Sequence, residues 1–290
     1  MTSKLNISTV IVSLALVSLI GCGEYGGGAS LVPKVTILPA DLSGDAEASD
    51  SGTTTAGTPE TEGGEGPGTL VGRVVLDGAY DALPSLYVKG ADIKDKEVCA
   101  AEDIPDERLV LGEGRGVKNV FVFMKKAPKG SPKPSSAEPV IFDQKNCRFL
   151  PHCMIVPVGA TLKVLSGDDV AHNTHTNPAR NNGVSSLVAA NDREGQWELV
   201  CTSAENPFSV TCDFHSWMKA YHLPLDHPYG AVTDDNGNFE ITDVPAGEHD
   251  FVVWHEAANG NFVERKLKVK VSAGQKTEIE IPYAVSKLAL

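Results

Sequence analysis

The stretch Phe208-Ser-Val-Thr-Cys212-Asp-Phe-His215-Ser-Trp-Met218 joins an alternating pattern to three side chains with soft or borderline donor atoms. Its apolar residues alternate with polar ones up to Cys212, as in a half-buried strand, so the Cys212 sulfur is expected on the same side as its apolar neighbours. His215 and Met218 follow at spacings that a tight loop can fold around one point. The stretch therefore predicts a strand whose end offers a thiolate, an imidazole and a thioether.

A second imidazole stands upstream, in Ala171-His172-Asn173, just after the strand-like residues 161–166. Two imidazoles and a thiolate with a long axial thioether are the ligand set of blue-copper electron-transfer sites. The sequence therefore predicts one type 1 copper site with the ligands His172, Cys212, His215 and Met218. No open coordination position for a substrate is evident, which favours a carrier of single electrons over a catalyst.

Two other interpretations of these residues stay open. Zinc also binds Cys and His, but structural zinc takes four strong ligands, so a thioether in fourth place favours copper. Without any metal, His172 would be a hydrogen-bonded surface histidine, Met218 a core filler and Cys212 a disulfide partner. Further histidines are expected outside the ligand set: His175 beside it or exposed, His222 and His227 in a proline-rich turn, and His152 at a place that the sequence leaves open.

From residue 68 onward the apolar residues recur with a period of two, which predicts strands. Residues 266–271 and 278–281 alternate apolar with charged side chains, as half-buried antiparallel strands do. Residues 120–124 are apolar on both faces and are expected in a central strand. Glycine and proline between these segments supply the turns, and residues 192–200 have a pattern compatible with one short helix. An all-β fold with one or two β-sandwiches is expected.

The copper ligands lie in a sequence context with a family resemblance. Val156-Pro-Val-Gly-Ala-Thr-Leu-Lys-Val164, the His172-Asn173 pair and Cys-x-x-His-x-x-Met together resemble the cupredoxin family over residues 139–224, with an amicyanin-like loop spacing. The resemblance implies a Greek-key cupredoxin β-sandwich and makes Asn173 the hydrogen-bonding neighbour of the ligands. It also implies that His215, between Phe214 and Trp217, reaches the surface and exchanges electrons with a redox protein partner. Ala171 replaces a proline that is common in the family, which affects loop stiffness more than ligation.

The segments on either side carry a second resemblance. The string 230–247, which runs from Gly-Ala-Val-Thr to Val-Pro-Ala-Gly, and the following Asp250-Phe-Val-Val253 resemble the transthyretin-like (carboxypeptidase regulatory-like) β-sandwich. Gly72-Arg-Val-Val75 and Val120-Phe-Val-Phe123 match its early strands. Residues 68–138 and 225–290 are then expected to form one sandwich with the cupredoxin domain inserted between them. Two consecutive modules with a separate N-terminal hairpin are the alternative.

The N-terminal residues predict export. Residues 1–22 carry a lysine, an apolar run too short to span a bilayer and the end Leu19-Ile-Gly-Cys22, which resembles a bacterial lipobox whose cysteine is lipidated. An ordinary signal peptide with an incidental Cys22 is the alternative. Residues 23–67 are acidic and rich in Gly, Ser and Thr, as in a disordered linker. An extracytoplasmic lipoprotein, held to a membrane through Cys22, is expected.

Apart from Cys22, the chain has five cysteines, an odd number. In an oxidising compartment spare thiols tend to pair, so an odd number leaves at least one thiol without a partner in the chain. Ligation of a metal by Cys212 would leave four cysteines for two disulfides. The preferred pairs are Cys99 with Cys147 and Cys153 with Cys201, although three connectivities are compatible with the sequence.

Charge and composition narrow the function further. The 290 residues carry 38 acidic and 25 basic side chains, a net charge of −13, whereas nucleic-acid binding needs clustered Lys and Arg, so no nucleic-acid partner is expected. Both modules together resemble lipoproteins labelled methylamine-utilisation-like. The sequence favours a membrane-tethered copper electron carrier. The alternative is a non-redox adhesion or carbohydrate-binding β-sandwich lipoprotein with a structural or degenerate metal site.

Overall fold

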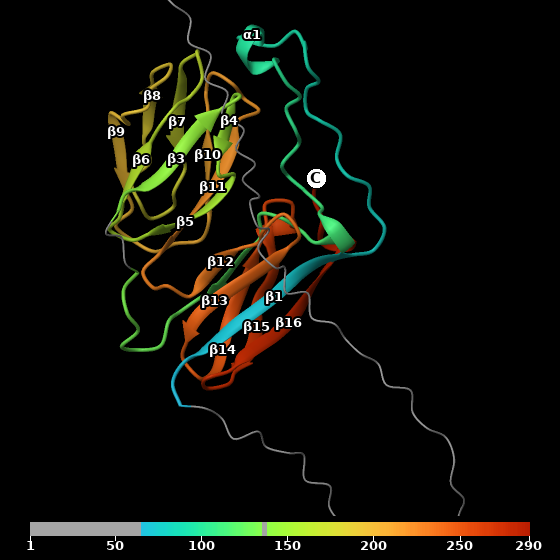
Figure 1. The fold of residues 1–290 in the computed structure, drawn as a ribbon, viewed down its shortest axis with the longest axis vertical. Helices are drawn as coiled ribbons and strands as arrows, with labels where there is room; N and C mark the ends of the chain where they lie inside the picture. Colours follow the sequence, from blue (N-terminus) through green and yellow to red (C-terminus); the bar gives the residue numbers. More distant parts are fainter. Residues whose placement is uncertain (1–64, 135–137) are drawn as a thin grey trace, which may run out of the picture. The chain divides into compact units, whose positions relative to one another are not determined.

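The computed structural model describes residues 65–134 and 138–290 (Figure 1). The expected lipobox with Cys22, and the expected linker 23–67 except for its last residues, lie outside the described residues. None of the helices in the described part is long and apolar enough to cross a membrane.

The described residues form an all-β fold, as the alternating pattern predicts. Its strands pair into four sheets. The only α-helix in this part of the chain is the short α1 (Lys96–Cys99), and three single turns of 3-10 helix accompany it: η1 (Glu113–Arg115), η2 (Asn259–Asn261) and η3 (Val285–Lys287).

Two of the sheets are built from strands near the two ends of the described chain. One has the order β13 (Asn238–Val244), β1 (Gly68–Asp77), β16 (Lys276–Ala284); the other has the order β12 (Gly230–Val232), β2 (Phe121–Met124), β14 (Gly247–Trp254), β15 (Phe262–Val271). They share one hydrophobic core, to which β1 contributes Val74, β2 contributes Val122 and β14 contributes Phe251. These two sheets therefore form a β-sandwich.

The other two sheets are built from the intervening strands. One has the order β5 (Cys153–Pro157), β11 (Lys219–Leu225), β10 (Phe208–Thr211), β7 (His172–Thr176), β8 (Ser185–Val188); the other has the order β4 (Arg148–Leu150), β3 (Val140–Lys145), β6 (Thr161–Val164), β9 (Trp197–Val200). Their shared core includes Phe142 of β3, Leu162 of β6 and Val210 of β10. They form a second β-sandwich, which can be followed by its labels in Figure 1.

Strand β2 is buried on both faces, as the apolar run 120–124 predicts. Val122 and Met124 belong to the first core, whereas Phe121 and Phe123 pack on the other side with Cys153 and Tyr221 of β5 and β11. Its hydrogen-bonded neighbours are β12 and β14, both of which follow residue 225 in the sequence. Strands before residue 139 thus pair with strands after residue 225.

The expectation of a short helix at residues 192–200 is wrong. The Asp192 carboxylate accepts hydrogen bonds from the backbone amides of Glu194, Gly195 and Gln196, so it stabilises a turn in place of a helix. The chain then continues as β9, which pairs antiparallel with β6.

Of the two preferred disulfides, one is present. Cys99 is bonded to Cys147, with a sequence separation of 48. The pairing of Cys153 with Cys201 is wrong, since both are free and buried. Cys153 belongs to the hydrophobic cluster that contains Phe121 and Phe123 of β2, whereas Cys201 belongs to the core of the second sandwich. The two thiols therefore lie on different faces.

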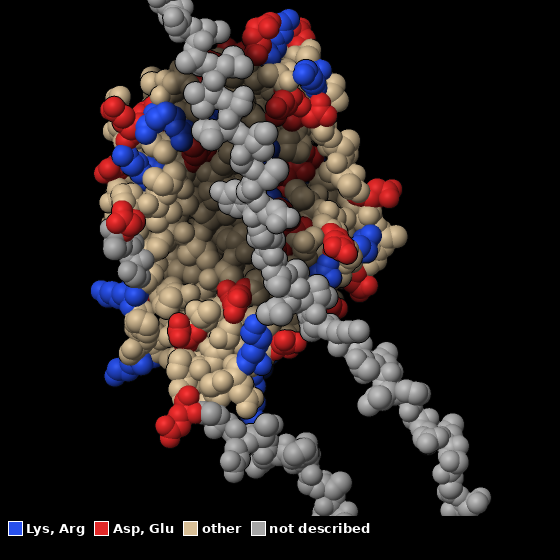
Figure 2. All heavy atoms as spheres, viewed as in Figure 1, with Lys and Arg blue, Asp and Glu red and all other residues tan. Residues whose placement is uncertain are grey.

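The charged side chains on the face shown in Figure 2 are dispersed, and lysine and arginine are interspersed with aspartate and glutamate. A broad area of uncharged atoms separates them in this view.

Candidate metal centre

The end of β10 lies beside β7, and the two strands pair antiparallel. Val210 lies opposite Thr176 and Thr211 lies opposite His175. Continuing this register by one step places Cys212, the first residue after β10, opposite Thr174, the residue that follows Asn173. The alternating strand 208–212 and the distant His172-Asn173 pair are thus brought together by sheet pairing.

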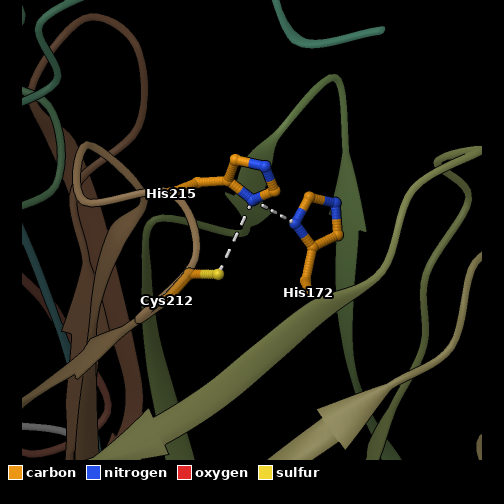
Figure 3. Close-up of side chains that lie close together, drawn as sticks. All are labelled: His172, Cys212 and His215. Carbon is orange, nitrogen blue, oxygen red and sulfur yellow. Dashed lines mark hydrogen bonds between the residues drawn. The ribbon is translucent and has the colours of Figure 1, made fainter. Parts of the chain in front are cut away.

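Three donor atoms converge at this edge (Figure 3). His172 Nδ1 lies 3.0 Å from His215 Nδ1, and Cys212 Sγ lies 3.8 Å from the same His215 nitrogen. All three residues are at most 2% exposed. The donor atoms of His172, Cys212 and His215 lie within 4.8 Å of one another, close enough to hold one metal ion.

The loop after β10 closes on itself and brings Met218 back to the strand. The Cys212 amide donates to the Met218 carbonyl at 3.3 Å, and the Met218 amide donates to the His215 carbonyl at 2.9 Å. Met218 is 1% exposed and belongs to the same core as Cys212. Its place in the loop agrees with an axial ligand, and ligation by its sulfur stays a prediction.

Asn173 joins the two segments that carry the donor atoms. Its amide donates to Cys212 Sγ at 3.5 Å, and its side-chain oxygen accepts the Asp213 amide at 2.6 Å. Its side-chain nitrogen donates to Ser185 at 2.9 Å and to the Asp213 carboxylate at 2.7 Å. Asn173 therefore contacts the thiol sulfur and fixes the loop after β10 against β7.

Two carboxylates hold the far nitrogens of the histidines, and neither was identified as a site residue from the sequence. His172 Nε2 lies 2.9 Å from Asp168 Oδ2, and His215 Nε2 lies 2.9 Å from Asp95 Oδ2. The sequence does contain a signal for the Asp168 contact, because this residue precedes His172 by only four positions. Asp95 is 120 residues from His215, and nothing local in the sequence points to this contact.

The hydrogen-bond pattern leaves unshared electron pairs facing the centre. When each Nε2–H donates to its carboxylate, each Nδ1 carries a lone pair, and these two lone pairs face one another across 3.0 Å. The Cys212 sulfur adds a third donor. Such an arrangement is repulsive unless a proton or a metal cation lies between the nitrogens, so the residues present fit a metal ion with nitrogen and sulfur ligands.

The thiol of Cys212 is prepared to ionise. Burial acts to raise its pKa, but hydrogen bonds with His172, His215 and the Asn173 amide outweigh burial and lower the pKa to about 6. For His172, burial acts to lower the pKa, whereas the hydrogen bonds with Asp168 and Cys212 raise it above its ordinary value. The thiolate is the form of cysteine that binds metals, so the centre presents its sulfur in the ligating state at neutral pH.

The other two free cysteines of the described chain behave differently. Burial raises the pKa of Cys201 to about 11, with a further contribution from Glu205. Burial, Glu256 and Glu107 likewise raise the pKa of Cys153 well above its ordinary value. Cys212 is therefore the cysteine of this group whose surroundings favour the anion.

The expectation that His215 reaches the surface is wrong. The residue is 0% exposed, because the segment that carries Asp95 lies over its Nε2 edge and Trp217 packs beside it with ring centroids 5.2 Å apart. Phe214 is 39% exposed, and the Lys94 ammonium lies 4.7 Å from its ring centre. The covering segment comes from before residue 100, which the loop sequence itself could not reveal.

The remaining histidines lie outside the cluster. His175 binds the Asp213 carboxylate at 2.9 Å and is partly exposed. His222 is buried between Phe142 and Phe208, and burial lowers its pKa to about 3. His227 lies beside Tyr229, and His152 pairs with Glu256. A second group of close donor atoms, Cys147, Asp168 and His172, includes a disulfide sulfur and so offers no thiolate.

Comparisons with known proteins add the following. The model of polysaccharide lyase family 4, domain II, matches residues 204–279. Comparison with curated proteins gives no match.

Among solved structures, the chain is similar to a copper-containing nitrite reductase from Thermus scotoductus SA-01, with 15% identity, coverage of 34% of this chain and 25% of that chain, and a TM-score of 0.27. The chain thus spans a quarter of that protein. A purple cupredoxin from Nitrosopumilus maritimus has 20% identity, coverage of 30% and 99%, and a TM-score of 0.25. Amicyanin from Paracoccus versutus has 13% identity, coverage of 36% and 97%, and a TM-score of 0.27.

Proposed function

We propose that the chain binds one copper ion through His172, Cys212, His215 and Met218 and carries single electrons. The observation that carries the proposal is the convergence of two Nδ1 lone pairs and a thiolate-forming sulfur within 4.8 Å at a buried edge of the sheet. A bound copper ion supplies the one-electron chemistry, since it alternates between Cu(I) and Cu(II).

The protein's own residues keep the ligand geometry constant. The β7–β10 pairing and the Asn173 contacts fix the positions of His172 and Cys212. Burial of all the candidate ligands excludes bulk water from the centre. A rigid, dry site needs little rearrangement when its charge changes, which favours rapid electron exchange over substrate binding.

The placement of this site in the cell and in the chain belongs to the same proposal. Residues 139–224 are the copper-binding cupredoxin domain, inserted between the halves 68–138 and 225–290 of the first sandwich; the β2–β12 and β2–β14 pairings support this division. Residues 1–22 are a lipoprotein signal, residues 23–67 a linker, and Cys22 the lipid anchor in an extracytoplasmic compartment. A redox protein is the expected partner.

Copper binding is tested by titrating the full chain with Cu(II) and recording the visible spectrum. The expected result is stoichiometric binding with an intense thiolate-to-copper band. Cys212→Ser is expected to lose the band because it removes the sulfur ligand. Cys153→Ser is the matched control, since it removes a buried thiol outside the centre and is expected to keep the band.

Other outcomes separate the alternatives. A folded wild-type chain that takes up zinc in preference and stays colourless with copper would replace the proposal by a structural zinc site. A folded chain that binds neither metal would favour the adhesion or carbohydrate-binding β-sandwich.

A further inference from the structure

Both histidines of the centre have a carboxylate on the nitrogen that faces away from the donor cluster. The two contacts have the same length of 2.9 Å, yet Asp95 and Asp168 come from separate segments of the chain. A carboxylate in this position fixes the tautomer and the ring orientation of a metal-binding histidine and increases the electron density on the ligating nitrogen.

Asp168 is held rigidly. It lies in the connection between β6 and β7, is 1% exposed, and accepts the backbone amides of Asn146 at 2.7 Å and Cys147 at 2.8 Å. Asn146 and Cys147 form the two-residue turn between β3 and β4, and both have a positive φ, of 53° and 50°. This backbone conformation is the one that tight two-residue hairpins require, and here it directs both amides at one carboxylate.

The segment that carries Asp95 is anchored by the disulfide between Cys99 and Cys147, at its Cys99 end. Its carbonyl accepts the amides of Val98 and Cys99 at 3.0 and 2.9 Å, and Cys99 is bonded to Cys147. The Cys99–Cys147 disulfide therefore ties the segment that carries Asp95 to the turn that holds Asp168. Through this connection, one covalent bond constrains the carboxylate partners of both histidines.

The charges at the centre have a consequence for a bound ion. The Cys212 thiolate and the carboxylates of Asp95 and Asp168 bring three negative charges close to the position between the Nδ1 atoms. Apart from His172, the basic partner of Asp168 in the described chain is Lys145, whose Nζ lies at 3.8 Å on a side chain that is 53% exposed and therefore screened. Buried negative charge stabilises Cu(II) more than Cu(I), because the oxidised ion carries the larger positive charge.

We propose that Asp95 and Asp168 are positioning residues that lock the two histidines in the ligating orientation and bias the copper centre toward its oxidised state. Asp95 does so from a segment that also closes the His215 edge to solvent. This inference rests on the copper site of the proposed function and adds to it a structural determinant of the reduction potential.

The test is a redox titration of the copper-loaded full chain, comparing wild type with Asp95→Asn and Asp168→Asn. Asparagine keeps the shape of the side chain and removes its charge. Asp95→Asn is expected to lower the Cu(II)/Cu(I) ratio at fixed potential about tenfold, an upward shift of about 59 mV for one electron. Loss of such a carboxylate is also expected to weaken Cu(II) binding about 10- to 100-fold. Asp168→Asn is expected to act in the same direction and more strongly, since that side chain is fully buried.

Two comparisons separate this role from a structural one. Asp92→Asn removes a charge three residues from Asp95, on a side chain that is 96% exposed and pairs with Lys96, so it is expected to leave the potential unchanged. Asp95→Glu keeps the charge and is expected to keep the reduction potential close to the wild-type value, without the upward shift of Asp95→Asn. Asp95 is partly exposed, so its variants remain informative even if Asp168→Asn fails to fold.

A direct probe of the histidine contact completes the test. In nitrogen NMR spectra of the Cu(I) protein, the Nε2 proton of His215 is expected to exchange slowly with water in wild type and rapidly in Asp95→Asn. A wild-type chain with the thiolate-to-copper band and equal potentials for Asp95→Asn and Asp92→Asn would overturn this inference and leave the copper site standing. A wild-type chain without copper binding would overturn both.

Discussion

The backbone amide of Cys147 donates a 2.8 Å hydrogen bond to the carboxylate of Asp168, and the same carboxylate holds His172. The indole nitrogen of Trp217, in the ligand loop, donates to the Cys147 carbonyl at 3.2 Å. The turn that contains Cys147 thus contacts both segments that supply the candidate ligands: the segment of Asp168 and His172, and the loop that carries Trp217. The Cys99–Cys147 disulfide therefore supports the geometry of the centre in addition to stabilising the fold.

The first prediction concerns this disulfide. The double variant Cys99→Ser/Cys147→Ser frees a loop with a sequence separation of 48 and is expected to lower the free energy of unfolding by about 2–4 kcal/mol. Chemical denaturation of the metal-free chain measures the change. Cys201→Ser is the control, since Cys201 is buried but cross-links nothing. An equal loss of stability in both variants would contradict a role for the cross-link.

The second prediction concerns Met218. Met218→Leu nearly conserves volume in the core, so its cost in stability is expected to stay below about 1.5 kcal/mol. Copper is expected to remain bound with its thiolate band, because Cys212 and the two histidines are untouched, while the reduction potential rises with the loss of the weak thioether donor. Met154→Leu changes a methionine in the same core but outside the ligand loop, and it is expected to leave both the thiolate band and the reduction potential unchanged. A Met218→Leu potential equal to that of wild type would show that the sulfur is not a ligand.

The third prediction concerns the acid stability of the fold. Burial lowers the pKa of His222 to about 3, while in the unfolded chain it is near 6.5, so the unfolded state binds more protons between these values. His222 therefore contributes stability that is complete above pH 6.5 and is lost as the pH falls toward 3, by about 1.4 kcal/mol per pH unit. Both ring nitrogens of His222 lack a hydrogen-bond partner in the described structure.

His222→Leu is expected to make the free energy of unfolding depend less steeply on pH between pH 6.5 and 4. Denaturant titrations at several pH values measure this dependence. His249→Leu serves as a control because it removes a histidine that is only partly buried on β14. An unchanged slope in His222→Leu would mean that other groups carry the acid sensitivity.

Much of the architecture could be predicted from local pattern. Residues 266–271 and 278–281 lie in β15 and β16, and residues 121–124 form a strand covered on both faces, because side chains alternate between the two faces of a strand and the chain must bury its apolar face. The spacing Cys212, His215, Met218 likewise predicts a compact loop, since these residues are neighbours along one tight turn. In each case a few consecutive residues contain the whole signal.

Contacts between distant segments could not be predicted in this way. The sequence determined that this chain is all-β and that one strand end offers sulfur and imidazole donors. Only the tertiary structure decided that His172 joins them through the β7–β10 register, that Cys153 and Cys201 point into different cores, and that Asp95 covers His215 from 120 residues away. The physical reason is that alternation fixes which face a side chain occupies, whereas its neighbours across a sheet or beneath a covering segment depend on how separate parts of the chain pack.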